Sequence, residues 1–379
     1  MWIAILIAVL TGTIFGIIYL WFRFQRFGIV LFLAGDRKWL RRLYGSLPLV
    51  GIIIYGFFDV VNAIIILLHV MIFWLLADLV GWLINRFRTN QMTEEETVND
   101  EIKRFRPYWR GLGVLLFSTI YLGVGWYLAH HVWVTRYDIV SDKLSGQAGL
   151  KVVLFADSHL GATFDGEGFA EQMNRIQDEK PDMVLIAGDF VDDSTTREDM
   201  LRACIALGEI STTYGVYYIP GNHDMGYYNS REFSYSELLE ELSKSGVIVL
   251  EDEVVDVTDT ISIAGRKDKS MSDRRPIDEL IMGIDAKRYM IVLDHQPNDY
   301  AAESAAGADL VLSGHTHGGQ LIPINFVGEW LGANDRTYGW EKRGTTEFIV
   351  TSGISDWAIG FKTGTKSEYV VLNLLGETN

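Results

Sequence analysis

Two long apolar stretches dominate the first third of the chain and limit what it can fold into. Residues 1–22 contain no charged side chain, and residues 43–85 contain no lysine or arginine and only two acids, Asp59 and Asp78. A helix of about 20 apolar residues is long enough to span the hydrocarbon core of a membrane. We therefore expect residues 1–134 to form a transmembrane domain.

The lengths of these stretches predict about four helices. Residues 43–85 as one helix would rise about 65 Å, roughly twice the hydrocarbon thickness, so we expect a turn near residues 59–62. The first basic residues, Arg23 and Arg26, follow the first apolar stretch, which favours a retained anchor over a cleaved signal peptide. The predicted helices span residues 1–22, 43–60, 64–85 and 111–134, and residues 135–149 are expected to be a linker.

The distribution of lysine and arginine predicts the orientation of these helices. Residues 23–42 and residues 86–110 each hold six of these basic residues, and such loops favour the cytoplasmic side. If both loops are cytoplasmic, both termini and all residues after 134 lie outside the cytoplasm. A single crossing by residues 43–85 would instead place the two loops on opposite sides. The predicted orientation therefore requires residues 43–85 to cross the membrane twice.

Polar side chains also occur at membrane depth, where they are costly and often functional. An alternative is that they belong to turns and to the membrane interface, and the sequence leaves both interpretations open. These residues are Asp59, Asn62, His69 and Asp78.

The second part of the chain is strongly acidic. Residues 145–379 carry a formal charge of −20, against +4 for residues 1–144. Such a domain would repel a phosphate backbone, so we expect no nucleic-acid partner, and nothing in the sequence predicts a protein partner. The single cysteine, Cys204, excludes an intramolecular disulfide and a thiolate metal cluster.

Strand-like and helix-like segments alternate from residue 150 onward, which is typical of a layered α/β domain. Amphipathic stretches at residues 169–176 and 197–210 predict helices between the first strands. Short runs rich in apolar residues predict strands at residues 150–156, 183–187, 216–219, 247–250, 261–265, 289–294, 309–313, 347–352 and 368–374.

Short polar motifs begin where several predicted strands end, and all five histidines after residue 150 belong to them. Ligands bind at that edge of open α/β sheets because loops from several strands converge there. Histidine, aspartate and asparagine without cysteine suit metals that accept mixed nitrogen and oxygen ligands. The motifs are Asp157-Ser158-His159, Gly188-Asp189-Phe190-Val191-Asp192, Gly221-Asn222-His223-Asp224, His295 and Gly314-His315-Thr316-His317.

In this order, the motifs resemble those of the calcineurin-like metallophosphoesterases over residues 150–379. The form Gly314–Gln320 (GHTHGGQ) is similar to the bacterial membrane-associated branch of that family, in which multi-span N-terminal regions also occur. The resemblance implies a four-layer α-β-β-α sandwich, here preceded by an α-helical transmembrane domain. It also implies two divalent transition-metal ions, Mn, Fe or Zn, as cofactors.

The resemblance further implies a role for each motif residue. Asp189 would bridge the two ions, while His223 would be the catalytic acid that protonates the leaving oxygen and Asp224 would orient it. The remaining metal ligands would be Asp157, His159 and His317 for one ion and Asn222, His295 and His315 for the other.

Two further groups of residues have open interpretations. Asp192 and Asp193 either hold a loop or a ligand histidine, or are surface carboxylates. A basic cluster either guides an anionic headgroup toward the metals or is a solvated loop; its members are Arg266, Lys267, Lys269, Arg274 and Arg275.

The sequence as a whole predicts a multi-pass cell-membrane protein with a metal-dependent phosphoesterase domain outside the cytoplasm. Two metals about 3.5–4 Å apart can activate a water and stabilise charge on a phosphoryl group. The expected reaction is hydrolysis of a lipid-linked or cell-envelope phosphoester, with a phosphodiester as the expected substrate and the bilayer and its lipids as partners. Alternatives are a cytoplasm-facing pyrophosphatase of a nucleotide-linked lipid precursor and a non-catalytic phosphate sensor.

Overall fold

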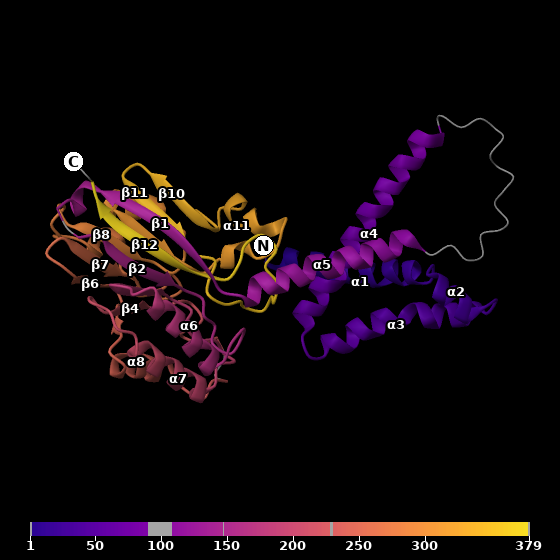
Figure 1. The fold of residues 1–379 in the computed structure, drawn as a ribbon, viewed down its shortest axis with the longest axis horizontal. Coiled ribbons are helices and arrows are strands. Elements are labelled where there is room, and N and C mark those ends of the chain that lie inside the picture. The colour runs from indigo at the N-terminus through magenta and orange to yellow at the C-terminus, as the bar shows by residue number, and fades with distance from the viewer. Residues whose placement is uncertain (1, 90–107, 147, 228–229, 378–379) are drawn as a thin grey trace. The chain divides into compact units, whose positions relative to one another are not determined.

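The structure is a computed structural model that describes residues 2–89, 108–146, 148–227 and 230–377. The chain divides into two compact units, residues 1–124 and residues 125–379, and each is described by itself (Figure 1). Much of the predicted basic loop at residues 86–110, including Lys103, Arg104 and Arg106, lies outside the described residues.

The first unit is helical in its described residues. Three helical stretches are long and apolar enough to cross a membrane: Leu6–Phe24, Val60–Phe87 and Trp109–His130. The helices are α1 (Trp2–Phe24), α2 (Gly28–Ala34), α3 (Lys38–Gly56), α4 (Val60–Thr89) and the larger part of α5 (Trp109–His130).

Helices α3 and α4 divide the apolar stretch at residues 43–85, with a turn over residues 57–59. α3 does not qualify as a span because Lys38, Arg41 and Arg42 lie in its first turns. Only its part from residue 43 to residue 56 is free of charge, which is shorter than the hydrocarbon core requires. The arrangement with four spans therefore stays a prediction.

Polar side chains of the first unit satisfy one another. The carboxylate of Asp78 accepts a hydrogen bond from the hydroxyl of Tyr19 and forms ion pairs with Arg23 and Arg110. The backbone amide and the side chain of Asn62 donate to Asp59 at the start of α4. These contacts support a structural role for Asp59, Asn62 and Asp78.

The second unit consists of strands and helices that alternate much as the sequence predicts. Its strands are β1 (Trp133–Ser141), β2 (Leu150–Phe155), β3 (Met183–Ala187), β4 (Val216–Ile219), β5 (Ile248–Val249), β6 (Glu253–Asp256), β7 (Ile261–Gly265), β8 (Tyr289–Leu293), β9 (Leu310–Ser313), β10 (Gly339–Arg343), β11 (Thr346–Val350) and β12 (Glu368–Gly376). Its helices are α6 (Gly166–Asp178), α7 (Arg197–Gly208), α8 (Tyr235–Lys244), α9 (Ile277–Leu280), α10 (Tyr300–Ala306) and α11 (Val327–Trp330), with 3-10 turns η2 (Asp142–Leu144), η3 (His317–Gly319) and η4 (Ile324–Phe326).

The strands form two mixed sheets of six. One sheet has the order β1-β12-β2-β3-β4-β5, in which β2 to β5 are parallel. The other has the order β10-β11-β9-β8-β7-β6, in which β11, β9, β8 and β7 are parallel. The carboxyl ends of neighbouring parallel strands lie at one edge of each sheet, and the polar motifs follow these ends.

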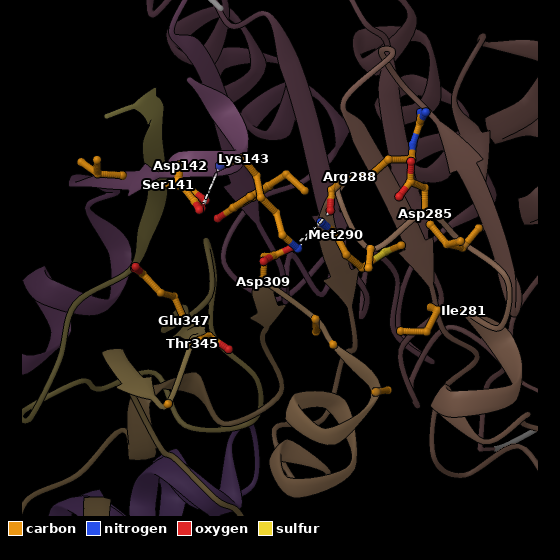
Figure 2. A pocket seen from close by; sticks show the side chains of 18 of the residues that line it. Ser141, Asp142, Lys143, Ile281, Asp285, Arg288, Met290, Asp309, Thr345 and Glu347 are labelled. Carbon is orange, nitrogen blue, oxygen red and sulfur yellow. Dashed lines mark hydrogen bonds and ion pairs between the residues drawn. The ribbon is translucent and has the colours of Figure 1, made fainter. Parts of the chain in front are cut away.

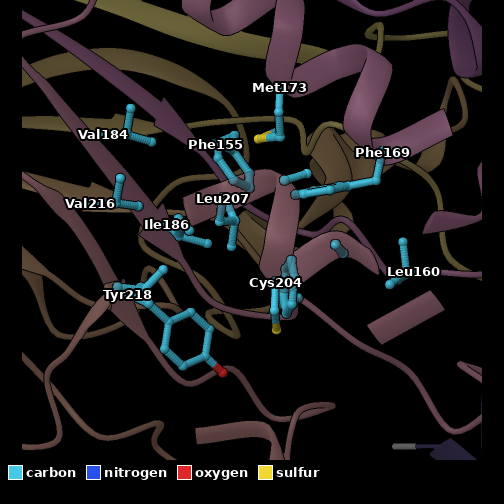
Figure 3. Close-up of a cluster of buried hydrophobic side chains, with 14 of the residues drawn as sticks. Phe155, Leu160, Phe169, Met173, Val184, Ile186, Cys204, Leu207, Val216 and Tyr218 are labelled. Carbon is cyan, nitrogen blue, oxygen red and sulfur yellow. The ribbon is translucent and has the colours of Figure 1, made fainter. Parts of the chain in front are cut away.

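Three hydrophobic clusters hold four layers together, which confirms the predicted α/β sandwich. Leu154 and Leu185 of the first sheet meet Ile291 and Leu312 of the second between the two sheets. Helices α6, α7 and α8 cover the outer face of the first sheet, where Phe155 packs against Phe169 and other apolar side chains (Figure 3). Helices α9 and α10 cover the outer face of the second sheet.

The prediction of a linker over residues 135–149 is wrong for the first half of that range. Residues 133–141 form β1, which pairs in parallel with β12 along its whole length. The alternation of exposed and buried positions in this segment is weak, and only Ile139 is fully buried. The adjoining Lys143 joins the two sheets, because its ammonium group donates to Asp309 (2.8 Å) and to the carbonyl of Arg288 (3.2 Å) in a pocket of about 530 Å³ (Figure 2).

Candidate metal centre

Loops from both sheets supply the residues of the candidate site. In the first sheet, Asp157 and His159 follow β2, Asp189 follows β3, and Asn222 and His223 follow β4. In the second sheet His295 follows β8, and the pair His315 and His317 follows β9. Because β2-β3-β4 and β8-β9 are parallel neighbours, these loops start from adjacent strand ends.

The seven predicted metal ligands come together in the structure. Nε2 of His159 lies 3.1 Å from Nε2 of His317, and 3.6 Å from Oδ2 of Asp189. The same carboxylate oxygen lies 3.1 Å from Nε2 of His295, which is 3.2 Å from Oδ1 of Asn222. Asp189 therefore lies between a histidine from each side, as a bridging carboxylate would.

The predicted ligands fall into two groups of atoms that could each hold an ion, and Asp189 belongs to one of them. Asp157, His159 and His317 form one group whose atoms lie within 4.8 Å of one another. Asp189, His295 and His315 form the other. The backbone amide of His315 also donates to both oxygens of Asp157, at 2.9 and 3.0 Å, so the two groups share a hydrogen-bonded framework.

The arrangement of these atoms fits bound cations. Nδ1 of His295 donates to the carbonyl of Ala187 (2.7 Å), so in the neutral ring Nε2 presents its lone pair to the oxygens of Asp189 and Asn222. Acceptor atoms that face each other in a buried site need a cation or an extra proton between them. Burial lowers the pKa of His315 to about 4 and lowers that of His317, which favours the neutral imidazole that binds metals. At His295 the carboxylate of Asp189 outweighs burial and raises the pKa, so without a cation a proton is favoured between these two groups.

The backbone is strained at most of the candidate ligands. Five of them have left-handed φ angles: Asp157 (55°), His159 (35°), Asp189 (52°), His315 (70°) and His317 (48°). L-residues rarely adopt this conformation, and strain of this kind concentrates at functional sites where the surroundings enforce it. These left-handed φ angles turn the five side chains toward one another at the edge of the sheets, whereas an extended backbone would point successive side chains to opposite faces.

Two glycines permit the close approach of the loops. A Cβ atom at Gly221 would lie 2.2 Å from Oδ1 of Asp189. A Cβ atom at Gly188, where φ is 86°, would lie 2.7 Å from Nδ1 of His295. Both positions therefore require glycine for steric reasons.

The structure corrects the predicted partner of His223. Nδ1 of His223 lies 3.1 Å from Oδ1 of Asp192, which was one of the two acids with an open interpretation. Asp224 instead accepts hydrogen bonds from the backbone amides of Phe190, Val191 and Gly221. Burial lowers the pKa of His223, but the hydrogen bond that its ring donates to Asp192 and the neighbouring carboxylates outweigh burial and raise the pKa.

Comparison with known proteins places this geometry in a family. The family model described as calcineurin-like phosphoesterase matches residues 150–319. An uncharacterized metallophosphoesterase of Helicobacter pylori (strain J99) is 31% identical over 67% of this chain and 70% of its own length. The chain belongs to the calcineurin-like metallophosphoesterase family. It is accordingly a hydrolase that acts on phosphoester bonds.

Two further relatives extend the comparison of this metallophosphoesterase. An uncharacterized metallophosphoesterase of Aquifex aeolicus is 33% identical over 56% of this chain and 80% of its own length. A protein of Danio rerio named transmembrane protein with metallophosphoesterase domain is 32% identical over 47% of this chain and 43% of its own length. The three helices long and apolar enough to cross a membrane agree with that name.

Two aromatic side chains that sequence reasoning missed border the metallophosphoesterase site. The ring centroid of Trp357 lies 4.9 Å from that of His223 and 6.4 Å from that of His159. Tyr227 lies 4.9 Å from His223, and its hydroxyl accepts a hydrogen bond from Nδ2 of Asn222 (2.6 Å). Neither belongs to a metal-ligand motif, so the sequence carried no signal for them.

A buried lysine supports the loop that carries Trp357. The ammonium group of Lys362 donates to the carbonyls of Ser352 (2.8 Å) and Ser355 (3.0 Å) and lies 3.4 Å from Asp356. Lys362 is fully buried, and burial lowers its pKa while burial raises the pKa of Asp356. The pair holds the loop against the site.

Two arginines of the basic cluster, Arg266 and Arg274, are neutralised by acids, whereas Lys269 and Arg275 are exposed. Arg266 is buried and pairs with Asp294 (2.9 Å), Asp299 (2.7 Å) and Glu303 (3.3 Å). Arg274 also pairs with Asp294. The acids that neutralise these arginines lie 20 to 37 residues further along the chain, outside the segment that the sequence marks as basic.

Proposed function

We propose that the chain is a membrane-tethered phosphodiesterase with two divalent ions, acting on a lipid-linked or cell-envelope phosphoester outside the cytoplasm. The observation that carries the proposal is the position of Asp189 between His159 and His295, which belong to two different groups of ligand atoms. The GHTHGGQ sequence supports assignment to the bacterial membrane-associated branch, and the helices at the N-terminus support a lipid-linked substrate.

The ligand groups define how the ions would be held. Asp157, His159 and His317 would bind one ion, and Asn222, His295 and His315 the other, with Asp189 shared. Two divalent ions bound there would supply an activated water and neutralise negative charge on the phosphoryl group. Mn, Fe or Zn fits the mixed nitrogen and oxygen donors.

The chain's own residues would complete the reaction. Asp192 engages Nδ1 of His223, so Nε2 is the nitrogen that faces the leaving oxygen and gives it a proton. The carboxylates around His223 raise its pKa, which favours the protonated form that this role requires. Trp357 packs against the His223 ring and limits its rotation.

The test is hydrolysis by the purified full-length protein of bis-p-nitrophenyl phosphate and p-nitrophenyl phosphate. We expect chelation to abolish turnover and Mn²⁺, Zn²⁺ or Fe²⁺ to restore it, with the diester cleaved faster. Asp189→Asn should lose turnover and bound metal while the circular dichroism spectrum is unchanged. Asp259→Asn, at an exposed turn, is the matched control.

Two outcomes would contradict the proposal. Full activity of Asp189→Asn would exclude the shared-carboxylate mechanism. Faster cleavage of the monoester would exclude the diester assignment while leaving the metal centre intact. A reporter fused at the C-terminus tests sidedness separately, since a cytoplasmic signal would favour a nucleotide-linked lipid precursor as substrate.

A further inference from the structure

A short apolar segment projects from the catalytic unit directly after the last metal-ligand motif. Residues 322–331 (IPINFVGEWL) contain one charged residue, Glu329, and its carboxylate accepts a hydrogen bond from the backbone amide of Thr337. All exposed residues of the segment are apolar: Ile322, Pro323, Ile324, Phe326, Trp330 and Leu331. Trp330 is 81% exposed. A contiguous patch of this kind on a folded domain marks an interaction surface.

The apolar segment is fixed to the loop beside the metal centre. The side-chain amide of Gln320 donates to the carbonyls of Trp357 (3.3 Å) and Ile359 (3.5 Å). The amide of Ile322 donates to the hydroxyl of Thr363 (2.9 Å). The patch therefore lies on the same framework as His317 and Trp357, and does not hang from a separate loop.

The last turns of α5 contact this framework as well, and they belong to the same compact unit. The amide of Lys362 donates to the carbonyl of Gly125 (3.0 Å), and the amide of Ser367 donates to that of Leu128 (2.9 Å). The packing is close, because a Cβ atom at Gly125 would lie 2.8 Å from the side chain of Thr363. The end of a helix that can span a membrane thus rests on the segment that holds the apolar patch.

Aromatic side chains mark the end of α5 as a membrane interface. Trp126 and Tyr127 are about half exposed, and the ring of Trp126 stacks on that of His130 at 4.5 Å. Tryptophan and tyrosine are enriched where a membrane helix leaves the hydrocarbon. A lipid surface at this depth would lie next to residues 361–367, to which the apolar segment is hydrogen-bonded.

We propose that residues 322–331 enter the interfacial layer of the bilayer and hold the mouth of the metal centre at the level of the lipid headgroups. Continuity with the end of α5 and the absence of charge among the exposed residues favour lipid over a second protein surface. The proposal concerns membrane contact and does not depend on the chemistry proposed for the site.

The experiment places a fluorescent label on the patch of the full-length protein. Phe326→Cys and Trp330→Cys are labelled with a polarity-sensitive dye and reconstituted in nanodiscs of phosphatidylcholine and phosphatidylglycerol. The native Cys204 does not interfere, because it is buried and burial raises its pKa to about 12. Met282→Cys, whose native side chain is 75% exposed in the same unit, is the control.

Doxyl groups on the lipid chains are expected to quench labels 326 and 330 by about half or more and to shift their emission to the blue, as interfacial burial requires. The label at 282 should respond only to aqueous iodide. Quenching of the patch labels by iodide alone would overturn the proposal. Protection from both quenchers would also overturn it, because a protein surface, such as a second copy of the chain, would then cover the patch.

Discussion

Oδ1 of Asp192 lies 3.1 Å from Nδ1 of His223, and its other oxygen lies 3.6 Å from Nδ1 of His159. One carboxylate therefore binds the proposed acid by a hydrogen bond and lies close to a proposed metal ligand. This arrangement couples the geometry of the leaving-group side of the site to that of the metal side. Asp224, which shares the motif of His223, instead accepts hydrogen bonds from three backbone amides.

Asp192→Asn is expected to lower activity and to change its pH dependence. The substitution removes a carboxylate that raises the pKa of His223, so the histidine loses its proton at lower pH. The basic limb of the kcat/KM profile should move to lower pH, with a loss of about 10- to 100-fold near the optimum. The profile is measured with bis-p-nitrophenyl phosphate, and the exposed Glu198→Gln serves as control. If the basic limb does not move, Asp192 does not raise the pKa of His223.

Added metal is expected to stabilise the protein as well as to activate it. Binding to the folded state alone adds about 2.7 kcal/mol when free metal is 100 times its dissociation constant. The ligands must be deprotonated, so the rise in unfolding temperature should be larger at pH 7.5 than at pH 5.5. Scanning fluorimetry with and without Mn²⁺ or Zn²⁺ measures it. An equal rise in a His295→Ala and His317→Ala double variant would place the metal elsewhere.

Lys362→Met is expected to destabilise the catalytic unit in a pH-dependent way. Removing the ammonium group leaves Asp356 buried without its partner, at a cost of about 3–5 kcal/mol for a buried pair broken on one side. Burial already raises the pKa of Asp356, so its folded form binds a proton more readily than its unfolded form. The variant should therefore lose stability as pH rises from 5 toward 7.

Thermal unfolding at several pH values tests this expectation, and Lys366→Met is the matched control. Lys366 is a neighbouring cation that lies 5.6 Å over the ring of Trp133 and is only half buried. If the two variants unfold at the same temperature throughout, the buried pair contributes nothing specific.

Arg266→Ala is expected to destabilise the second sheet rather than to weaken substrate binding. It leaves Asp294 and Glu303, both almost fully buried, with one cation fewer. The unfolding temperature should fall by several degrees, whereas Lys269→Ala, at an exposed position in the same stretch, should leave it unchanged. A raised KM for a lipid phosphodiester in the Lys269 variant would instead support headgroup guidance by these cations.

The metal centre was predictable because its residues follow parallel strands. Asp157, Asp189 and His295 each follow the end of a short apolar strand. The carboxyl ends of neighbouring parallel strands lie at the same edge of a sheet, so these residues are brought close together. The choice between Asp192 and Asp224 as partner of His223 was not predictable, since both acids lie in short motifs close to the ring. Side-chain direction there depends on left-handed backbone angles such as that of Asp189, which residue spacing does not report.

The strand β1 was missed for a different reason. Its sequence, Trp133–Ser141, follows an apolar helix after two residues and mixes charged with apolar side chains. What stabilises it is the ladder with β12, a partner more than 200 residues away. Pairing over such a distance leaves no local pattern, and the acids that neutralise Arg266 also lie outside its own segment, 28 to 37 residues further along the chain.

The ladder between β1 and β12 also sets where the chain can be cut. A soluble fragment that starts at residue 145 would lose β1 and leave the nine residues of β12 from Glu368 to Gly376 as an open edge. Most side chains of β12 are buried and apolar, and an uncovered edge of that kind recruits strands from other molecules. Such a fragment is therefore an aggregation hazard, and a soluble catalytic piece has to begin no later than Trp133.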